Sequence, residues 1–339
     1  MQHERAPRPL PLFLEMIREA GTKDPALARA ALGGLRAYEQ AERVPRPEPK
    51  PVVARVGATS LRGHGGEGPP ALLIPSLINP PRVLDLDANV SLTAAIAAMG
   101  RQALLLDWGP ADARSPLDVA GHVSQLLVPL LSKLEQPPAL IGYCLGGTMA
   151  IAAANCASVE RVITLAAPWD FSGYDPASRE ALARLWLQSR ASAQSLGALP
   201  MEVLQAAFWS LDPARTVRKF AEFGRLNPAS AEARRFVQLE DWANEGEPLP
   251  YPAARELIED LFGANATGTG EWRIDGKIIA DRLDAPLLNI TADHDVIAPA
   301  SSAPAGERIG LPAGHVGMIV GSARAQLHEA LAGFLTPCR

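Results

Sequence analysis

The fold is decided by the stretch Ala139-Leu140-Ile141-Gly142-Tyr143-Cys144-Leu145-Gly146-Gly147. Its first three residues have the pattern of a buried strand, and a helix of small residues follows over 145–155. A sharp turn between strand and helix needs small neighbours because backbone segments come close there, and the glycines at 142 and 146 supply them. Such a turn exposes its central side chain above the sheet, so the sequence predicts a nucleophile elbow that carries Cys144.

A thiol at this position has a chemical consequence. The reactive form is the thiolate, and the N-terminus of the following helix favours that anion. The alternative interpretation is a small buried apolar side chain between two loop glycines. The strand, turn and helix order favours the nucleophile, whereas Cys156 and Cys338 lie in no motif and are expected to be inert.

Short apolar runs alternate with helical segments on both sides of the elbow, which is typical of a mostly parallel sheet flanked by helices. Ser91 is expected to cap the helix that Gly100 closes, and Ser115 to open the helix interrupted at Pro129. The expected strands are residues 71–74, 103–107, 139–141, 161–165 and 286–291, and the expected helices are 91–99, 115–134, 145–155 and 322–334.

The alternation defines a domain plan. Residues 1–60 are predicted to form a leader arm, with two amphipathic helices and a proline-rich linker. Residues 61–170 are the first part of the α/β core, and 282–339 its end. Between them, residues 171–281 show helix-like patterns with scattered aromatic residues, which indicates an inserted helical cap.

A nucleophile on an elbow needs an acid and a base, which follow it in the chain order nucleophile, acid, histidine. Both Asp293 and Asp295 come after the strand at 286–291. We favour Asp295, because the acid of an α/β hydrolase sits in a loop after the strand and several residues before a proline, while Asp293 also suits a turn or cap. His294 between them lacks a second ligand pair, so we expect no metal site.

The expected base is His315, in the glycine-flanked loop before the last helix. A neutral imidazole there can accept the Cys144 proton, with Asp295 fixing its tautomer. The alternative is a loop histidine bonded to backbone. The other five histidines lack the required chain order or setting; they are His3, His64, His122, His294 and His328. The expected oxyanion hole combines the backbone N–H of Leu145 with that of Ser76 or Leu77, of which Leu77 is preferred.

Composition excludes several classes of function. The chain has 339 residues, 32 basic and 37 acidic side chains, and a net charge of −5, so polynucleotide binding is not expected. No apolar run is long enough to span a membrane, and the 47% hydrophobic fraction fits a soluble globular protein. Three cysteines without a secretory leader indicate a reducing compartment, so we expect a cytoplasmic protein.

Several segments together resemble polyhydroxyalkanoate synthases, in particular the short catalytic subunits of class III type. The resemblance covers most of the chain from about residue 70, and the cysteine at the elbow is its most specific feature. It is carried by residues 74–86, Leu106-Asp107-Trp108-Gly109, the elbow 142–147, Ala167-Pro168-Trp169-Asp170-Phe171 and residues 313–318.

The resemblance implies an α/β-hydrolase fold and an acyltransferase that moves 3-hydroxyacyl groups from coenzyme A to a cysteine and then to a growing polyester. Cys144 would carry the acyl group, His315 would be the base and Asp295 its acid partner. A coenzyme A thioester would be a substrate, with no bound cofactor. Expected contacts include a polyester granule surface and either a homodimer or an accessory subunit.

Two alternatives stay open. The same three residues would serve a hydrolase, such as a thioesterase, an esterase or an intracellular polyester depolymerase, which must admit water to the acyl-enzyme. A relative that kept only the fold and associates with granules is the third reading.

Overall fold

The computed structural model describes residues 6–336. Within them, an eight-stranded sheet has the order β1-β2-β6-β3-β7-β8-β13-β14. From β6 to β14 in this order, neighbouring strands pair in parallel, and the β1–β2 hairpin joins β6 in antiparallel fashion. The strands are β1 (Val52–Val56), β2 (Thr59–Gly63), β3 (Pro70–Ile74), β6 (Gln102–Asp107), β7 (Ala139–Tyr143), β8 (Arg161–Leu165), β13 (Leu287–Ala292) and β14 (Glu307–Leu311).

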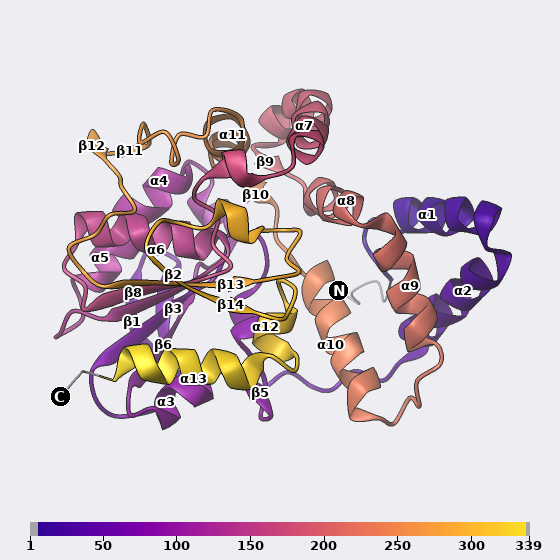
Figure 1. Cartoon of the computed structure of the whole chain (residues 1–339), viewed down its shortest axis with the longest axis horizontal. Coiled ribbons are helices and arrows are strands. Elements are labelled where there is room, and N and C mark those ends of the chain that lie inside the picture. Colours follow the sequence, from indigo (N-terminus) through magenta and orange to yellow (C-terminus); the bar gives the residue numbers. More distant parts are fainter. Residues whose placement is uncertain (1–5, 337–339) are drawn as a thin grey trace. The chain divides into compact units, whose positions relative to one another are not determined.

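Helices cover both faces of this sheet (Figure 1). Strands β3 and β7 are buried along their whole length, which explains why they read as continuous apolar runs. One face is covered by α4 (Val119–Gly121), η3 (His122–Leu127), α5 (Val128–Leu131) and α6 (Leu145–Cys156), and the other by α3 (Leu92–Ala98), α12 (Gly317–Val320) and α13 (Arg324–Leu335). This is the mostly parallel, helix-flanked sheet of an α/β-hydrolase fold, as predicted.

The helix caps test the sequence interpretation in detail. Ser91 caps α3 by accepting from Ala94 N at 2.9 Å, and Gly100 adopts a φ of +79°, both as expected. The prediction that Ser115 opens the next helix is wrong. Asp118 is the cap and accepts from Gly121 N at 2.7 Å, because residues 111–114 first form a 3-10 turn, η2 (Ala111–Arg114).

The linker interpretation also needs a correction near residue 60. Residues 52–56 and 59–63 form the β1–β2 hairpin, where we expected only arm and linker. Gly57, with a φ of +57°, makes the turn between these strands. Strand β1 follows directly after Pro51 and is largely exposed, so its pattern gave no buried face to recognise.

The chain divides into two compact units. One contains the described residues up to Glu48 together with Pro200–Gly246, and the other contains Pro49–Leu199 and the residues from Glu247 onward. The predicted arm and the middle of the predicted cap therefore belong to one unit. The rest of that predicted cap belongs with the sheet, as α7 (Pro176–Leu196), α11 (Tyr251–Arg255) and the π-helix η5 (Glu256–Gly263), with the short strands β9 (Ala198–Leu199), β10 (Leu249–Pro250), β11 (Arg273–Ile274) and β12 (Lys277–Ile278).

The smaller unit has its own apolar core. It is built from α1 (Leu10–Lys23), α2 (Pro25–Gln40), α8 (Met201–Leu211), α9 (Pro213–Phe223) and α10 (Ala231–Asn244). Phe13, Met16 and Ile17 of the arm are buried in it beside Phe220. The apolar side chains of the arm therefore pack on the core of their own unit.

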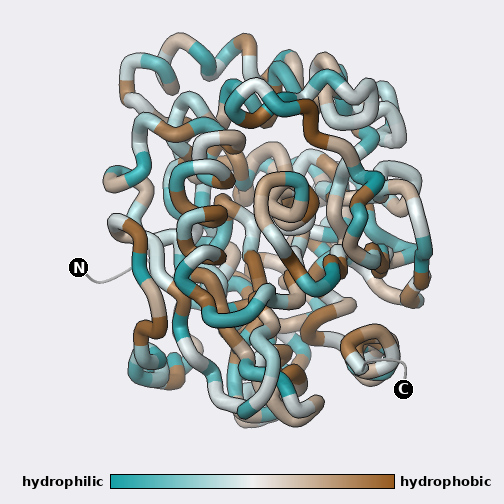
Figure 2. The backbone as a smooth tube through the Cα atoms, turned by 90° about the vertical axis from the view of Figure 1, so that its left-hand side faces the viewer, coloured by the Kyte–Doolittle hydropathy of each residue, from teal (hydrophilic) through white to brown (hydrophobic). Residues whose placement is uncertain are grey.

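Hydrophobic and hydrophilic segments alternate along the backbone (Figure 2). No helix among residues 6–336 has the length and apolar character needed to cross a membrane.

Two adjacent glycines of α2 allow a matched test of the smaller unit. A Cβ on Gly34 would lie 1.8 Å from Phe220 O of α9, whereas a Cβ on Gly33 would have no neighbour within 4 Å. We expect Gly34→Ala to lower the free energy of unfolding by about 1 to 3 kcal/mol, because α2 and α9 must separate. Gly33→Ala should raise it by roughly 0.5 to 1 kcal/mol.

Urea unfolding followed by tryptophan fluorescence measures both variants. Equal stability of the two would contradict the close approach of α2 and α9.

Candidate active site

The site begins at the carboxyl end of β7, where Cys144 occupies the turn into α6. Its φ is +57° and its ψ is −131°, a conformation that L-residues rarely adopt. Two backbone hydrogen bonds hold it, from Cys144 N to Leu165 O at 2.9 Å and from Gly147 N to Cys144 O at 2.8 Å. The strained backbone is that of a nucleophile elbow, and the thiol is partly exposed.

The flanking glycines are required by contacts. A Cβ on Gly142 would lie 2.4 Å from Gly146 O, and one on Gly146 would lie 2.1 Å from Ile74 O and 2.7 Å from Pro75 O. The start of α6 thus packs directly against the loop that follows β3. Any side chain at either position would push the elbow out of place.

Asp295 lies in the loop after β13, and its side chain is fully buried. Oδ1 accepts from Ile297 N at 2.8 Å and from Ala298 N at 3.0 Å, while Oδ2 accepts from His315 Nδ1 at 2.7 Å. A buried carboxylate with both oxygens bonded is fixed in orientation. It therefore holds the His315 ring with Nδ1 as the donor.

The other two polar residues of this loop point elsewhere. Asp293 and His294 are exposed. Within residues 6–336 no group of three or more histidine, cysteine or acidic side chains could hold a metal ion.

His315 lies between β14 and α12 and is 9% exposed. The Tyr143 ring packs on the imidazole with centroids 4.9 Å apart, and the Tyr143 hydroxyl donates to His315 O at 3.2 Å. Tyr143 directly precedes Cys144, so β7 supports the His315 imidazole as well as the thiol. The sequence gave no indication of this contact, because the two residues are 172 positions apart.

The pKa of His315 is raised above its ordinary value. Burial is the largest influence and acts to lower it, but the charges of Cys144 and Asp295, and hydrogen bonds to both, outweigh burial. The structure thus brings Cys144, Asp295 and His315 together. The raised pKa means that these surroundings favour the protonated form of the His315 ring.

Other candidate residues are engaged elsewhere. His122 bonds Asp118 O and Arg114, and burial lowers its pKa to about 4. His64 lies 2.9 Å from Asp85, and burial lowers the pKa of His328. Burial raises the pKa of Cys156, which disfavours its thiolate. His3 and Cys338 lie outside the described residues.

The candidate oxyanion donors lie on two neighbouring segments. Leu145 is the first residue of α6, and Ser76 and Leu77 belong to the loop after β3. The contact of Gly146 with Ile74 O and Pro75 O brings these segments together.

A further aromatic residue belongs to this region. The Tyr174 hydroxyl donates to Ile297 O at 2.9 Å, beside the Asp295 turn. Burial and the charges of Cys144 and Asp295 raise its pKa, so it stays a neutral phenol. It stacks on Phe171 and packs against Phe262 of η5. Sequence spacing alone did not single it out.

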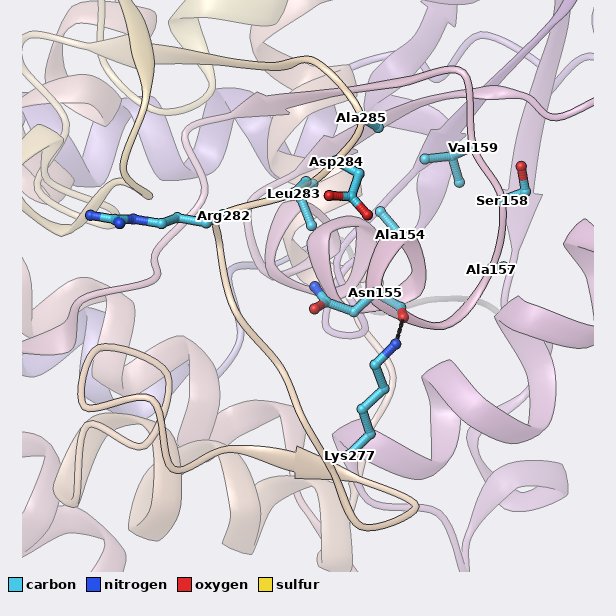
Figure 3. A pocket seen from close by; sticks show the side chains of 10 residues that line it. All are labelled: Ala154, Asn155, Ala157, Ser158, Val159, Lys277, Arg282, Leu283, Asp284 and Ala285. Atoms are coloured by element: carbon cyan, nitrogen blue, oxygen red, sulfur yellow. Dashed lines mark hydrogen bonds between the residues drawn. The ribbon is translucent and has the colours of Figure 1, made fainter.

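A cavity of about 330 Å³ lies at the other end of α6 (Figure 3). Asn155 and Lys277 line it, and Lys277 Nζ donates to Asn155 O. Cys144 precedes the first residue of α6, about 18 Å away along a 12-residue helix. This cavity is therefore not part of the site.

Comparison with known proteins adds sequence relatives. No protein-family model matches the chain. It is 26% identical over 272 residues to the poly(3-hydroxyalkanoate) polymerase subunit PhaC of Haloferax mediterranei, covering 75% of this chain and 55% of the relative. It is 26% identical to the Synechocystis subunit (79% and 77% covered) and 25% identical to that of Thiocystis violacea (78% and 80%). The chain spans little more than half the length of the haloarchaeal relatives.

Solved structures with a related arrangement include a thermophilic esterase from Thermogutta terrifontis and the enol-lactonase of Burkholderia xenovorans. Their identities are 16% and 18%, and both TM-scores are 0.47. They cover 87% and 85% of this chain, and the matches cover 98% and 100% of the solved chains.

The sheet order and the strained elbow define the chain as an α/β-hydrolase-fold protein with cysteine at the nucleophile position. Among such proteins, the curated sequence relatives that it resembles, at 25 to 26% identity, are poly(3-hydroxyalkanoate) polymerase subunits.

The buried His315–Asp295 pair predicts a pH effect. Asp295→Asn keeps an oxygen for the Ile297 and Ala298 N–H groups but removes the charge, so the pKa of His315 should fall towards the ordinary histidine range. Titration of the His315 ring by NMR measures this.

The raised pKa of His315 also makes the free energy of unfolding depend on pH. Because the folded pKa is raised, the contribution of the protonated pair is complete below roughly pH 6.5 and is lost as pH rises through the raised value. An unchanged His315 titration in the Asp295→Asn variant would contradict the assignment of the pair.

Proposed function

We propose that the chain is an acyltransferase of the polyhydroxyalkanoate-synthase type, which accepts 3-hydroxyacyl groups from coenzyme A and transfers them to the hydroxyl end of a polyester. Cys144 is the nucleophile, His315 the proton carrier and Asp295 its orienting acid. Leu145 N–H and Leu77 N–H, with Ser76 N–H as the alternative, receive the oxyanion.

The first step loads the enzyme. Cys144 Sγ, as the thiolate beside the protonated His315 ring, attacks the thioester carbonyl, and backbone N–H groups stabilise the negative oxygen that forms. The bond to the coenzyme A sulfur then breaks, and His315 gives its proton to that leaving thiolate. Because the pKa of His315 is raised, the ring holds this proton at neutral pH.

The second step uses the ring left neutral by the first. His315 accepts the proton of an acceptor hydroxyl as its oxygen attacks the acyl-cysteine. The Cys144 thiolate leaves, and the original ion pair is restored. The product is an ester one unit longer, and atoms and charges balance over the cycle.

The observation that carries the proposal is cysteine at the elbow, in a chain whose sequence relatives are polymerase subunits. A thioester to cysteine can transfer its acyl group to an alcohol as well as to water, which suits an elongating enzyme.

The wider context is part of the same proposal. The substrate is a coenzyme A thioester, without a bound cofactor, and the product polymer offers a granule surface. The proposal also includes a cytoplasmic location and either a homodimer or an accessory subunit.

The experiment incubates the full chain and Cys144→Ala with 3-hydroxybutyryl-coenzyme A, and follows both coenzyme A release and product mass. We expect release with oligomeric or polymeric ester from the wild type and neither from the variant. Release of coenzyme A with only free 3-hydroxybutyrate would instead make the chain a thioesterase. Release that survives in Cys144→Ala, or no release at all, would overturn the proposal.

A matched pair of carboxylates tests the acid. Asp295→Asn should lower the rate of coenzyme A release about a hundredfold, because His315 loses its charge partner and its fixed tautomer. Asp293→Asn removes an exposed carboxylate of the same loop and should leave the rate unchanged. Equal losses in the two variants would show that Asp295 has no special role.

A further inference from the structure

We infer that Trp108 is a positioning residue for acyl transfer, which holds the Pro75–Leu77 loop where its backbone N–H groups can meet the developing oxyanion. This inference rests on the proposed function, since it concerns the same reaction. Trp108 would act through this loop and not through a contact of its own with the reacting atoms.

The central contact is a hydrogen bond from Trp108 Nε1 to Pro75 O, 3.1 Å long and buried. Trp108 directly follows β6 and Pro75 directly follows β3, and these strands are parallel neighbours. The indole thus ties together two segments at the carboxyl edge of the sheet. This is the edge at which Cys144 leaves β7.

The bonded carbonyl lies next to both candidate donors. Pro75 O and Ser76 N–H belong to the same planar peptide unit, so fixing the oxygen fixes the direction of that N–H. The Leu77 N–H belongs to the next peptide unit. A bond to the carbonyl also polarises its peptide, which strengthens the N–H as a donor.

Trp108 is itself rigidly held. It is 4% exposed, and its carbonyl accepts from Thr59 Oγ1 at 2.8 Å. Its indole packs edge-on against His122, with ring centroids 5.7 Å apart. His122 is in turn held by Asp118 O at 2.6 Å and by Arg114 at 3.0 Å. A group fixed from several sides can restrain a loop.

On its other side the loop packs directly against α6, so its position must be held closely. Gly146 of α6 packs against Ile74 O and Pro75 O so closely that no Cβ fits. A small shift of the loop would therefore change the distance between the Leu145 N–H and the loop N–H groups. Oxyanion stabilisation depends steeply on such distances.

The test compares Trp108→Phe with Trp186→Phe. Trp186 is also 4% exposed and donates its indole N–H to Glu259 Oε1 at 2.8 Å, but it lies on α7. Acylation of Cys144 by p-nitrophenyl butyrate, read as the burst of nitrophenol, depends on the oxyanion hole. Alkylation of Cys144 by iodoacetamide forms no oxyanion, so it reports the thiolate and the fold alone.

We expect Trp108→Phe to slow acylation about tenfold with the apparent KM for the ester unchanged, and to leave alkylation at the wild-type rate. Thr59→Val removes the hydroxyl that donates to the Trp108 carbonyl, so it should slow acylation in the same selective way. This variant keeps the inference testable if Trp108→Phe does not fold. Trp186→Phe should match the wild type in both assays.

Two results would overturn the inference while leaving the proposed function intact. Equal acylation rates for Trp108→Phe and Trp186→Phe would exclude a positioning role, as would equal losses of acylation and alkylation in both Trp108→Phe and Thr59→Val. A wild type that is alkylated but never acylated would overturn the proposed function and this inference with it, so the two failures are distinguishable.

Discussion

The strained turn at Cys144 is the constraint on which the rest of the site depends. A φ of +57° at a residue other than glycine persists only where the surroundings enforce it. Three features of the surroundings enforce it here: the buried strand β7, the Leu165 carbonyl that accepts from Cys144 N, and the glycines that let α6 approach the loop after β3. The energy that holds the turn comes from the packing of the sheet, so fold and chemistry share one element.

The second requirement is a buried charge system. His315 and Asp295 are almost without solvent, and an unpaired charge there would be costly. The Asp295 carboxylate is satisfied on both oxygens, and the imidazole lies between it and Cys144. The protonated His315 ring is stabilised by the groups on either side of it. The arrangement is therefore sensitive to the loss of any one of the three.

Much of this could be predicted from sequence because the determinants are local. Ser91, Gly100 and Gly142 each act within a few residues. What could not be predicted depends on distant contacts. The Tyr143–His315 ring contact, the Trp108–Pro75 bond and the place of the arm beside α9 join residues far apart in the chain. Ser115 failed as a cap because Asp118 offers a carboxylate closer to the helix that forms.

The central claim is that Cys144 carries the acyl group. The most direct measurement is an acid quench during turnover of 3-hydroxybutyryl-coenzyme A, followed by peptide mass spectrometry. The account predicts a hydroxybutyryl or longer oligoester adduct on the peptide that contains Cys144, absent from Cys144→Ala. An adduct on another residue, or coenzyme A release in Cys144→Ala at the wild-type rate, would contradict it.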